Sequence, residues 1–385
     1  MPKLFASHFQ AGFECSTHRR KHDGARLDLI ATTGHDVHAR ADYLRVAADG
    51  LGTARDGLRW HLIEPEPGVY DWSSWRPMVD AAADAGVQVI WDLWHYGTPD
   101  WLDIFSADFP PRFAAFAAAA AREHARATGA VPVWCPLNEI SFFSHMAGEV
   151  GHFHPFAHGR GHALKQQLVR AGVAGAEALL AVDPRARLVW AEPCVNVLPA
   201  TYEPHDIADC EGWRQAQFQV FEMVCGRMNP ELGGRPALLD IVGANFYPHN
   251  QWIMGTRGSV PLGHHDWRPF SAMLTELHQR YGRLILVAET GAEGTARASW
   301  LHYIASEVED ARRAGADVQG ICLYPVLEYP GWDNDRACET GMYGPADATG
   351  RREAHQPLVE EIRRQQALAA ALAPPLAAEP FLLSR

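Results

Sequence analysis

A repeated alternation between short apolar runs and longer segments of helical composition constrains the fold of this chain more than any other feature. The runs are rich in Val, Ile, Leu and Trp, and the segments between them carry apolar residues at helical spacing. This alternation is typical of βα units, whose strands are buried on both faces of a parallel sheet. The predicted strands are 57–63, 87–93, 131–137, 188–191, 241–247, 284–288 and 318–324, with an earlier strand within 4–15.

Eight strands with seven intervening segments fit a closed (β/α)8 TIM barrel of the α/β class. An open doubly wound sheet shows the same alternation, but it commonly carries a Gly-rich phosphate-binding turn after its first strand. No such turn follows any of the strands here, and no linker rich in Pro, Gly and Ser interrupts the alternation. We therefore predict a single catalytic barrel over residues 1–365 and a loosely packed C-terminal tail over 366–385, which contains a double proline.

Charge and cysteine usage exclude several classes of partner. The 34 basic and 46 acidic residues give a formal net charge of −12, and the basic residues form no run that could follow a nucleic-acid backbone. No apolar stretch is long enough for a membrane span, and the first residues lack the pattern of a secretory signal. The 7 cysteines show no C-x-x-C spacing and indicate free thiols. We expect a cytoplasmic protein without nucleic-acid or membrane partners.

Two glutamates follow predicted strands directly. Asn138 and Glu139 come after the run 131–137, and Glu289 comes after 284–288. Either glutamate could simply be the first solvated residue of a loop, but a carboxylate directly after a long apolar run costs free energy unless something compensates. Catalytic residues of (β/α)8 enzymes project from the carboxyl ends of strands. Strands four and seven lie on opposite sides of such a barrel, so the two carboxylates could flank a bond held between them.

Three motifs, two of which contain these glutamates, resemble clan A of the glycoside hydrolases. They are PLNEI at 136–140, NFYP at 245–248 and VAETG at 287–291, and within the clan the closest pattern is family 1, the β-glucosidase family. The resemblance implies a retaining β-glycosidase with Glu139 as general acid/base and Glu289 as nucleophile. Its partner would be a small-molecule β-glycoside or oligosaccharide. We expect no cofactor and no metal.

The same resemblance implies sugar or nucleophile contacts for further side chains. DLWHYGTPDWL at 92–102 resembles the third-strand segment of family 1, and GLRW at 57–60 resembles its second strand. The expected substrate-binding residues are His95 at the innermost subsite, Asn138 at the sugar 2-hydroxyl, Arg59 and Tyr247 beside the nucleophile, and Trp332 stacked on a pyranose face.

The chain also departs from the family pattern in several places. Family 1 usually has Asn-Glu-Pro and Glu-Asn-Gly where Asn-Glu-Ile and Glu-Thr-Gly stand here, and the eighth strand ends in Tyr324-Pro325 rather than Trp-Ser. Clan members often carry a cis peptide at this point, and an X-Pro bond lowers the cost of that isomer to about 0.5–1 kcal/mol. We therefore predict a cis bond between Tyr324 and Pro325.

Other functions remain open from the sequence. The histidines of 152–162 could offer metal ligands, but the chain has no H-E-x-x-H, and contact with a sugar or aglycone is the expected use of this loop. The absence of a G-x-S-x-G elbow argues against an esterase. A non-catalytic sugar-binding barrel and a metal-dependent sugar isomerase are the alternatives, and a transglycosidase would use the same residues as a hydrolase.

Overall fold

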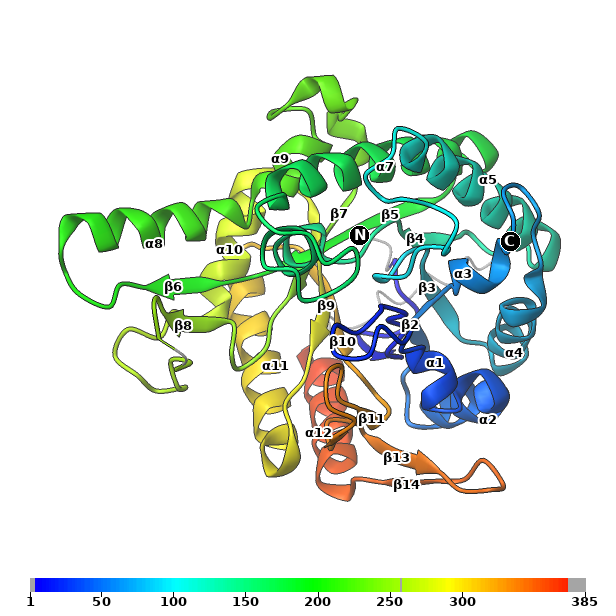
Figure 1. Cartoon of the computed structure of the whole chain (residues 1–385). Helices are drawn as coiled ribbons and strands as arrows, with labels where there is room; N and C mark the ends of the chain where they lie inside the picture. Colours follow the sequence, from blue (N-terminus) through cyan, green and yellow to red (C-terminus); the bar gives the residue numbers. More distant parts are fainter. Residues whose placement is uncertain (1–3, 257, 373–385) are drawn as a thin grey trace, which may run out of the picture.

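The computed structural model describes residues 4–256 and 258–372 and shows a closed barrel of parallel strands surrounded by helices (Figure 1). Around the barrel the order is β1-β10-β9-β7-β5-β4-β3-β2, so each strand pairs with its neighbours in the chain and β1 closes the circle on β10. The predicted single (β/α)8 barrel is confirmed. Its strands are β1 Phe9–Gly12, β2 Thr53–Gly57, β3 Gln88–Asp92, β4 Val133–Cys135, β5 Arg187–Pro193, β7 Ile241–Asn245, β9 Leu284–Thr290 and β10 Val318–Leu323.

Helices connect the strands and cover the outside of the barrel. The helix α4 shows how the sequence sets their ends, because Pro77 stands in its first turn and Gly86 closes it with φ at 67°. The helices are α1 Leu29–Thr32, α2 His35–Ala48, α3 Trp60–Ile63, α4 Arg76–Ala85, α5 Phe109–Ala127, α6 Ile140–Phe143, α7 Gly161–Val182, α8 Pro204–Ala216, α9 Gln219–Val224, α10 Phe270–Tyr281, α11 Arg297–Arg313 and α12 Gln356–Leu372. None of the helices in the described part of the chain is long and apolar enough to cross a membrane.

The strand side chains alternate between two apolar clusters. Ile90, Val189 and Ala191 belong to a small cluster that comes almost entirely from the strands and fills the barrel interior. Their neighbours Trp134 and Trp190 belong to the larger cluster between the barrel and the helices. This alternation follows from the two-residue period of a strand, and it leaves both faces of the sheet buried.

The second strand lies earlier than the sequence predicted. The expected strand was 57–63, but β2 ends at Gly57, and Trp60 begins the short helix α3. The segment Thr53–Gly57 reads TARDG and looks polar, yet every one of its residues is buried. The apolar residues that suggested a strand instead pack outward, with the Trp60 ring stacked on Phe116 at 5.0 Å. The other predicted strands overlap the observed ones.

The C-terminal helix α12 extends past the predicted boundary at residue 365. Residues 366–372 are helical, and the side-chain amide of Gln366 donates to the carbonyl of Asp49 at 2.9 Å. The rest of the predicted tail, 373–385, lies outside the described residues.

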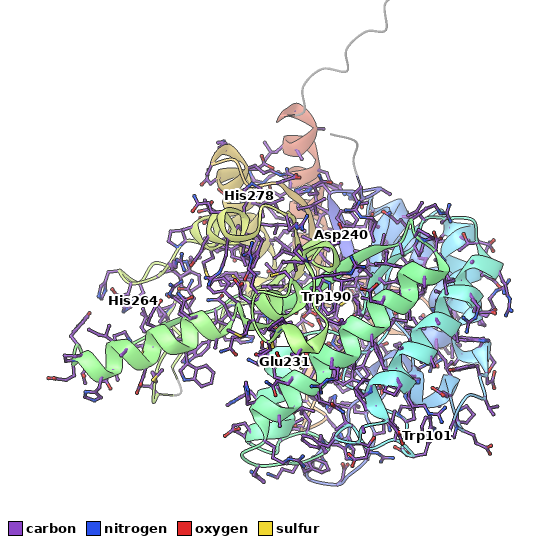
Figure 2. The ribbon with its side chains drawn as sticks, turned by 90° about the horizontal axis from the view of Figure 1, so that it is seen from above. Trp101, Trp190, Glu231, Asp240, His264 and His278 are labelled. Carbon is purple, nitrogen blue, oxygen red and sulfur yellow. The ribbon has the colours of Figure 1, made fainter. Side chains whose placement is uncertain are left out.

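An arm extends sideways from the barrel between β5 and α10. It consists of β6 (Asn196–Leu198), α8 (Pro204–Ala216) and β8 (Gln251–Ile253), and β6 and β8 form a small parallel sheet. In Figure 1 the arm points to the left, beyond the helices that surround the barrel. Figure 2 shows the same projection after a turn of 90°, with His264 on that side of the molecule. Shorter strands β11 Tyr329–Pro330, β12 Ala337–Cys338, β13 Tyr343–Ala346 and β14 Arg352–Ala354 follow β10.

Candidate active site

A cavity of about 1640 Å³ opens at the carboxyl ends of the barrel strands. This is the end at which TIM-barrel enzymes hold their substrates. The residues that line its floor follow different strands, so the closed barrel brings together segments that are far apart in the chain. They include Glu14 after β1, His95 and Tyr96 after β3, Glu139 after β4, Tyr247 after β7, Glu289 within β9 and Tyr324 after β10.

Glu289 is held on both of its carboxylate oxygens. Arg55 Nη1 donates to Oε1 at 2.7 Å, and the Tyr247 hydroxyl donates to Oε2 at 2.9 Å. The glutamate is only 4% exposed, so its neighbours fix both its position and its orientation. The sequence-based expectation that Tyr247 contacts this carboxylate agrees with the geometry.

Glu139 lies in the same cavity in a different electrostatic setting. It accepts hydrogen bonds from the Tyr96 hydroxyl at 2.7 Å and from Asn245 Nδ2 at 2.9 Å. Burial raises its pKa to about 8, and the negative charge of Glu289 adds to the increase, which these hydrogen bonds only partly offset. Burial and the neighbouring charge therefore favour the protonated form of Glu139, beside a second carboxyl group that Arg55 and Tyr247 hold in place.

Two cavity side chains come from residues with left-handed backbone. Glu139 has φ at 45° and Tyr96 has φ at 67°. Such conformations cost roughly 1–3 kcal/mol in residues other than glycine, and they persist only where the surroundings enforce them. The Glu139 backbone N–H donates to the carbonyl of Ala191 at 2.9 Å, which ties the end of β4 to β5.

Arg55 connects several side chains of the site. Its guanidinium donates to both oxygens of Asp92, at 2.9 and 2.7 Å, to Glu289, and to Asn138 Oδ1 at 2.7 Å. The side chain is completely buried and connects the ends of β2, β3, β4 and β9. Its guanidinium also lies over the Tyr324 ring, 5.4 Å from the centroid.

Arg59 does not take the position that the sequence predicted for it. Its guanidinium donates to Asp36 at 2.8 Å and to the carbonyl of Ser74 at 3.1 Å, and it does not line the cavity. The expectation is wrong because β2 ends at Gly57, which places the inward-facing arginine at position 55. The polar composition of TARDG hid this strand.

His95 and Asn138, which the sequence predicted as sugar-binding residues, lie side by side. The Nδ2 amide of Asn138 is 3.1 Å from His95 Nε2 and donates to the Tyr96 hydroxyl at 3.2 Å. On the other side of the ring, His95 Nδ1 is 3.0 Å from Asp92 Oδ2. Burial alone would lower the pKa of His95, but the hydrogen bond with Asp92 and the charge of Glu14 outweigh it, so the pKa is raised.

Glu14 is a further carboxyl side chain of the cavity, which the sequence did not reveal as a site residue. Its Oε1 accepts from the backbone N–H of Ser16 at 2.9 Å and lies 3.9 Å from His95 Nε2. Burial raises its pKa to about 7, although His95 opposes the increase. Tyr96 and Asn245, the two hydrogen-bond partners of Glu139, were also missed, and they stand next to predicted residues in the DLWHYGTPDWL and GANFYP segments.

Trp332 borders the cavity from the loop that follows β10. Its ring packs at 5.7 Å from Tyr96 and at 5.7 Å from Phe153, in edge-on arrangements. Its buried Nε1 has no hydrogen-bond partner among the described residues. In the same region, the Tyr324–Pro325 peptide bond is cis, as predicted.

One group of potential metal ligands lies at this site. Cys15, Asp92 and His95 bring donor atoms within 4.8 Å of one another. However, both Asp92 oxygens already accept from the Arg55 guanidinium, and a positive charge so close disfavours a cation. Within the described residues, no histidine of 152–162 belongs to a group with metal-ligand spacing. His162 lines the cavity, and the predicted sugar or aglycone contact of this loop stays a prediction.

Comparison with known proteins identifies solved structures with a similar fold. No protein-family model matches the chain, and no curated protein matches it in sequence. The β-glucosidase of Thermotoga maritima, solved in complex with glucoimidazole, is similar with a TM-score of 0.77 and 14% identity, over 95% of this chain and 100% of that one. β-Glycosidase BGL167 is similar with a TM-score of 0.73 and 18% identity, over 99% of each chain. The AHE enzyme of Alicyclobacillus herbarius has a TM-score of 0.70 and 19% identity, over 88% of each chain.

These similarities define the class of the fold. The chain has a (β/α)8 barrel of the kind found in family 1 β-glucosidases, and the likeness predicted from its motifs is confirmed at the level of the fold.

Proposed function

We propose that the protein is a retaining β-glycosidase that works through a covalent glycosyl-enzyme intermediate. One observation carries the proposal: two buried glutamates share a cavity in different surroundings, one oriented by Arg55 and Tyr247, the other with its pKa raised to about 8. A retaining glycosidase needs such a pair, because one carboxylate attacks while the other carboxyl gives a proton. The similarity of fold to β-glucosidases supports the same reading.

In the first step, a Glu289 oxygen attacks the anomeric carbon of the sugar. The bond from that carbon to the glycosidic oxygen breaks, and Glu139 transfers its proton to this oxygen, so the aglycone leaves as an alcohol. The transition state resembles an oxocarbenium ion, which the negative charge of Glu289 stabilises. Arg55 and Tyr247 keep the attacking carboxylate oriented during this step.

In the second step, water attacks the same carbon and releases the sugar from Glu289. Glu139 now accepts a proton from the water. The change of role follows from the electrostatics, because the charge of Glu289 helps to raise the pKa of Glu139, and that charge is absent while Glu289 is esterified. Two inversions at one carbon give a product that retains the β configuration.

The remaining predicted residues would bind the sugar. We assign His95 and Trp332 to sugar contacts because both line the cavity, and Trp332 has an unpartnered Nε1 donor. Asn138 would contact the 2-hydroxyl; its amide is oriented by Arg55, and its Nδ2 points at His95 and Tyr96, which border the cavity. The carboxyl groups of Glu139 and Glu289 are predicted to lie about 5–5.5 Å apart, as direct attack requires.

A panel of aryl β-glycosides with different sugars tests the proposal, with NMR of the first-formed product. We expect hydrolysis of at least one member and a β-configured sugar as the initial product. Glu289→Gln should abolish turnover, and a 2-fluoro sugar inactivator should label Glu289. No hydrolysis of any member by the wild-type protein would leave a sugar-binding role as the better reading, and an α product would exclude retention.

A further inference from the structure

The cavity is larger than the sugar-binding floor requires. Its volume of about 1640 Å³ exceeds the roughly 300–1000 Å³ of typical small-molecule pockets. Its lining extends from the barrel floor to residues of the arm formed by β6, α8 and β8, among them Trp213 of α8 and Trp252 of β8. The lining of this extension contains a group of apolar and aromatic side chains beside polar ones such as Asp209, Gln217 and His249; the group consists of His145, Met146, Val195, Trp213, Trp252 and Met254.

A row of aromatic rings leads from the loop of Glu139 into the arm. The helix α6 starts directly after Glu139 and runs into a π-helical turn, Ser144–Glu149, which carries His145. The His145 ring meets Trp213 of α8 edge-on at 5.4 Å, and Trp213 meets Trp252 of β8 edge-on at 6.3 Å. Trp213 remains 45% exposed, so much of its surface is open to a ligand.

Two polar side chains of the extension, Gln217 and Asn250, are engaged within the protein. Gln217 uses its amide on the backbone of Val195, accepting at 3.0 Å and donating at 3.2 Å. Asn250 accepts from the Tyr247 backbone N–H at 3.2 Å and donates to the carbonyl of Cys194 at 3.1 Å.

Two titratable groups, Lys165 and His145, lie beside them. Lys165 Nζ donates to Gln219 at 2.9 Å, and burial lowers the pKa of His145, so its ring is neutral at physiological pH. A sugar in this position would need partners for several hydroxyls, and leaving them unpaired costs free energy. A flat apolar group would instead match the exposed Trp213 face and need no such partners.

We propose that this extension is the binding site for an aromatic, planar leaving group. The inference rests on the proposed function, because Glu139 would protonate the oxygen that links sugar and leaving group, which places the leaving group beside Glu139. The aromatic row begins on the loop that follows Glu139. Other lining residues of the cavity, among them Glu14, His95 and Trp332, are left for the sugar.

Kinetics on two substrates with the same sugar test this assignment. We would use a 2-naphthyl β-glycoside and the β-glycosyl fluoride of the sugar that the aryl-glycoside panel selects. In Trp213→Ala and Trp252→Ala, we expect kcat/KM on the naphthyl substrate to fall about three- to tenfold, mainly through KM, because stacking on the leaving group is lost. On the glycosyl fluoride, whose leaving group cannot reach the arm, kcat/KM of the two variants should change less than twofold.

Tyr202→Ala is the matched control, since Tyr202 belongs to the same arm but is 81% exposed and does not line the cavity. Tyr202→Ala should leave kcat/KM unchanged on both substrates. Equal losses on both substrates in the Trp213 variant would overturn the assignment, because they would indicate a general structural effect. A selective loss on a disaccharide of the same sugar, without loss on the naphthyl substrate, would overturn it in favour of a sugar in the arm.

A binding measurement keeps this inference separate from the proposed function. 2-Naphthol alone should quench tryptophan fluorescence of the wild-type protein, and Trp213→Ala should weaken its binding about three- to tenfold. If the wild-type protein hydrolyses no glycoside but still binds 2-naphthol in this way, the proposed function fails and the aromatic site stands. If it hydrolyses aryl glycosides and does not bind 2-naphthol, the aromatic site fails.

Discussion

Arg55 Nη1 donates to Oε1 of Glu289 at 2.7 Å from a guanidinium that is completely buried. The same guanidinium serves both oxygens of Asp92 and the side-chain oxygen of Asn138. Burial alone would lower the pKa of Arg55, but the carboxylates of Asp92 and Glu289 raise it well above its ordinary value, so the charge is permanent. One arginine thus orients two carboxylates and one amide at the floor of the cavity.

Replacing Arg55 by lysine should lower activity strongly, since an ammonium on a flexible stem cannot serve three planar acceptors at once. Loss of a hydrogen bond to a charged group is worth about 1.5–3 kcal/mol, so we expect kcat on aryl β-glycosides to fall by about 10- to 100-fold. Arg59→Lys is the matched control, because Arg59 pairs with Asp36 outside the cavity, and it should keep kcat within about twofold. The opposite ranking of the two variants would contradict this orienting role of Arg55.

Glu14→Gln should change how stability depends on pH. Burial raises the pKa of Glu14 from an ordinary 4.5 to about 7 in the folded protein. A carboxyl with a raised folded pKa contributes stability in full below 4.5 and loses that contribution as pH rises through about 7. Relative to wild type, the glutamine variant should gain stability between these pH values, by at most roughly 3 kcal/mol.

Chemical denaturation of both proteins at several pH values measures this difference for Glu14. Glu66→Gln, at an exposed position, should track the wild-type protein throughout. A Glu14 variant whose stability relative to wild type stays constant from pH 4 to pH 8 would show that Glu14 does not titrate in this range.

The sequence allowed the barrel and both candidate glutamates to be predicted because each glutamate follows a continuous apolar strand. Arg55 and Asp92 could not be predicted in the same way. They lie within strands at positions where an isolated strand would carry an apolar residue, and only their ion pair across β2 and β3 makes their burial tolerable. Such pairing is a tertiary property that periodicity along one strand does not contain.

The same reasoning explains why Glu14 and the arm were not foreseen. Glu14 belongs to the site because its Oε1 lies 3.9 Å from Nε2 of His95, a residue that is distant in the sequence. The aromatic row likewise joins His145, Trp213 and Trp252 from three separate segments. None of these residues belongs to a recognisable motif in its own segment, and they line a common cavity only in the folded barrel.

His35→Gln should destabilise the fold in a pH-dependent way. His35 lies between two carboxylates outside the cavity, with Nδ1 at 2.9 Å from Asp42 and Nε2 at 2.9 Å from Asp56. Both ring nitrogens can donate only in the imidazolium form. Burial alone would lower the pKa of His35, but Asp56 and Asp42 raise it to about 9.

Breaking a buried ion pair costs about 3–5 kcal/mol, which is the expected loss for His35→Gln near neutral pH. A histidine with a raised folded pKa contributes stability in full below its ordinary 6.5 and loses it as pH rises through about 9. The difference in the free energy of unfolding between the wild-type protein and His35→Gln should therefore shrink over this pH range in denaturation experiments. His22→Gln, at an exposed position, serves as control and should show no gap. A gap that widens with pH would contradict the charged state of His35.

Glu139→Gln tests the proton donor through leaving groups and pH together. General acid catalysis contributes roughly 10²–10⁴-fold, so hydrolysis of glycosides with poor leaving groups should fall by that factor, while an activated dinitrophenyl glycoside, which leaves without a proton, should lose far less. The wild-type protein needs Glu139 protonated, and its pKa is raised to about 8, so kcat/KM should decline as pH rises through about 8. In Glu139→Gln this decline should vanish for the activated substrate, because no proton remains to be lost. Glu203→Gln, at an exposed position on the arm, should keep the wild-type profile. Equal losses on both substrates, or a basic limb that persists in the variant, would assign the proton to another group.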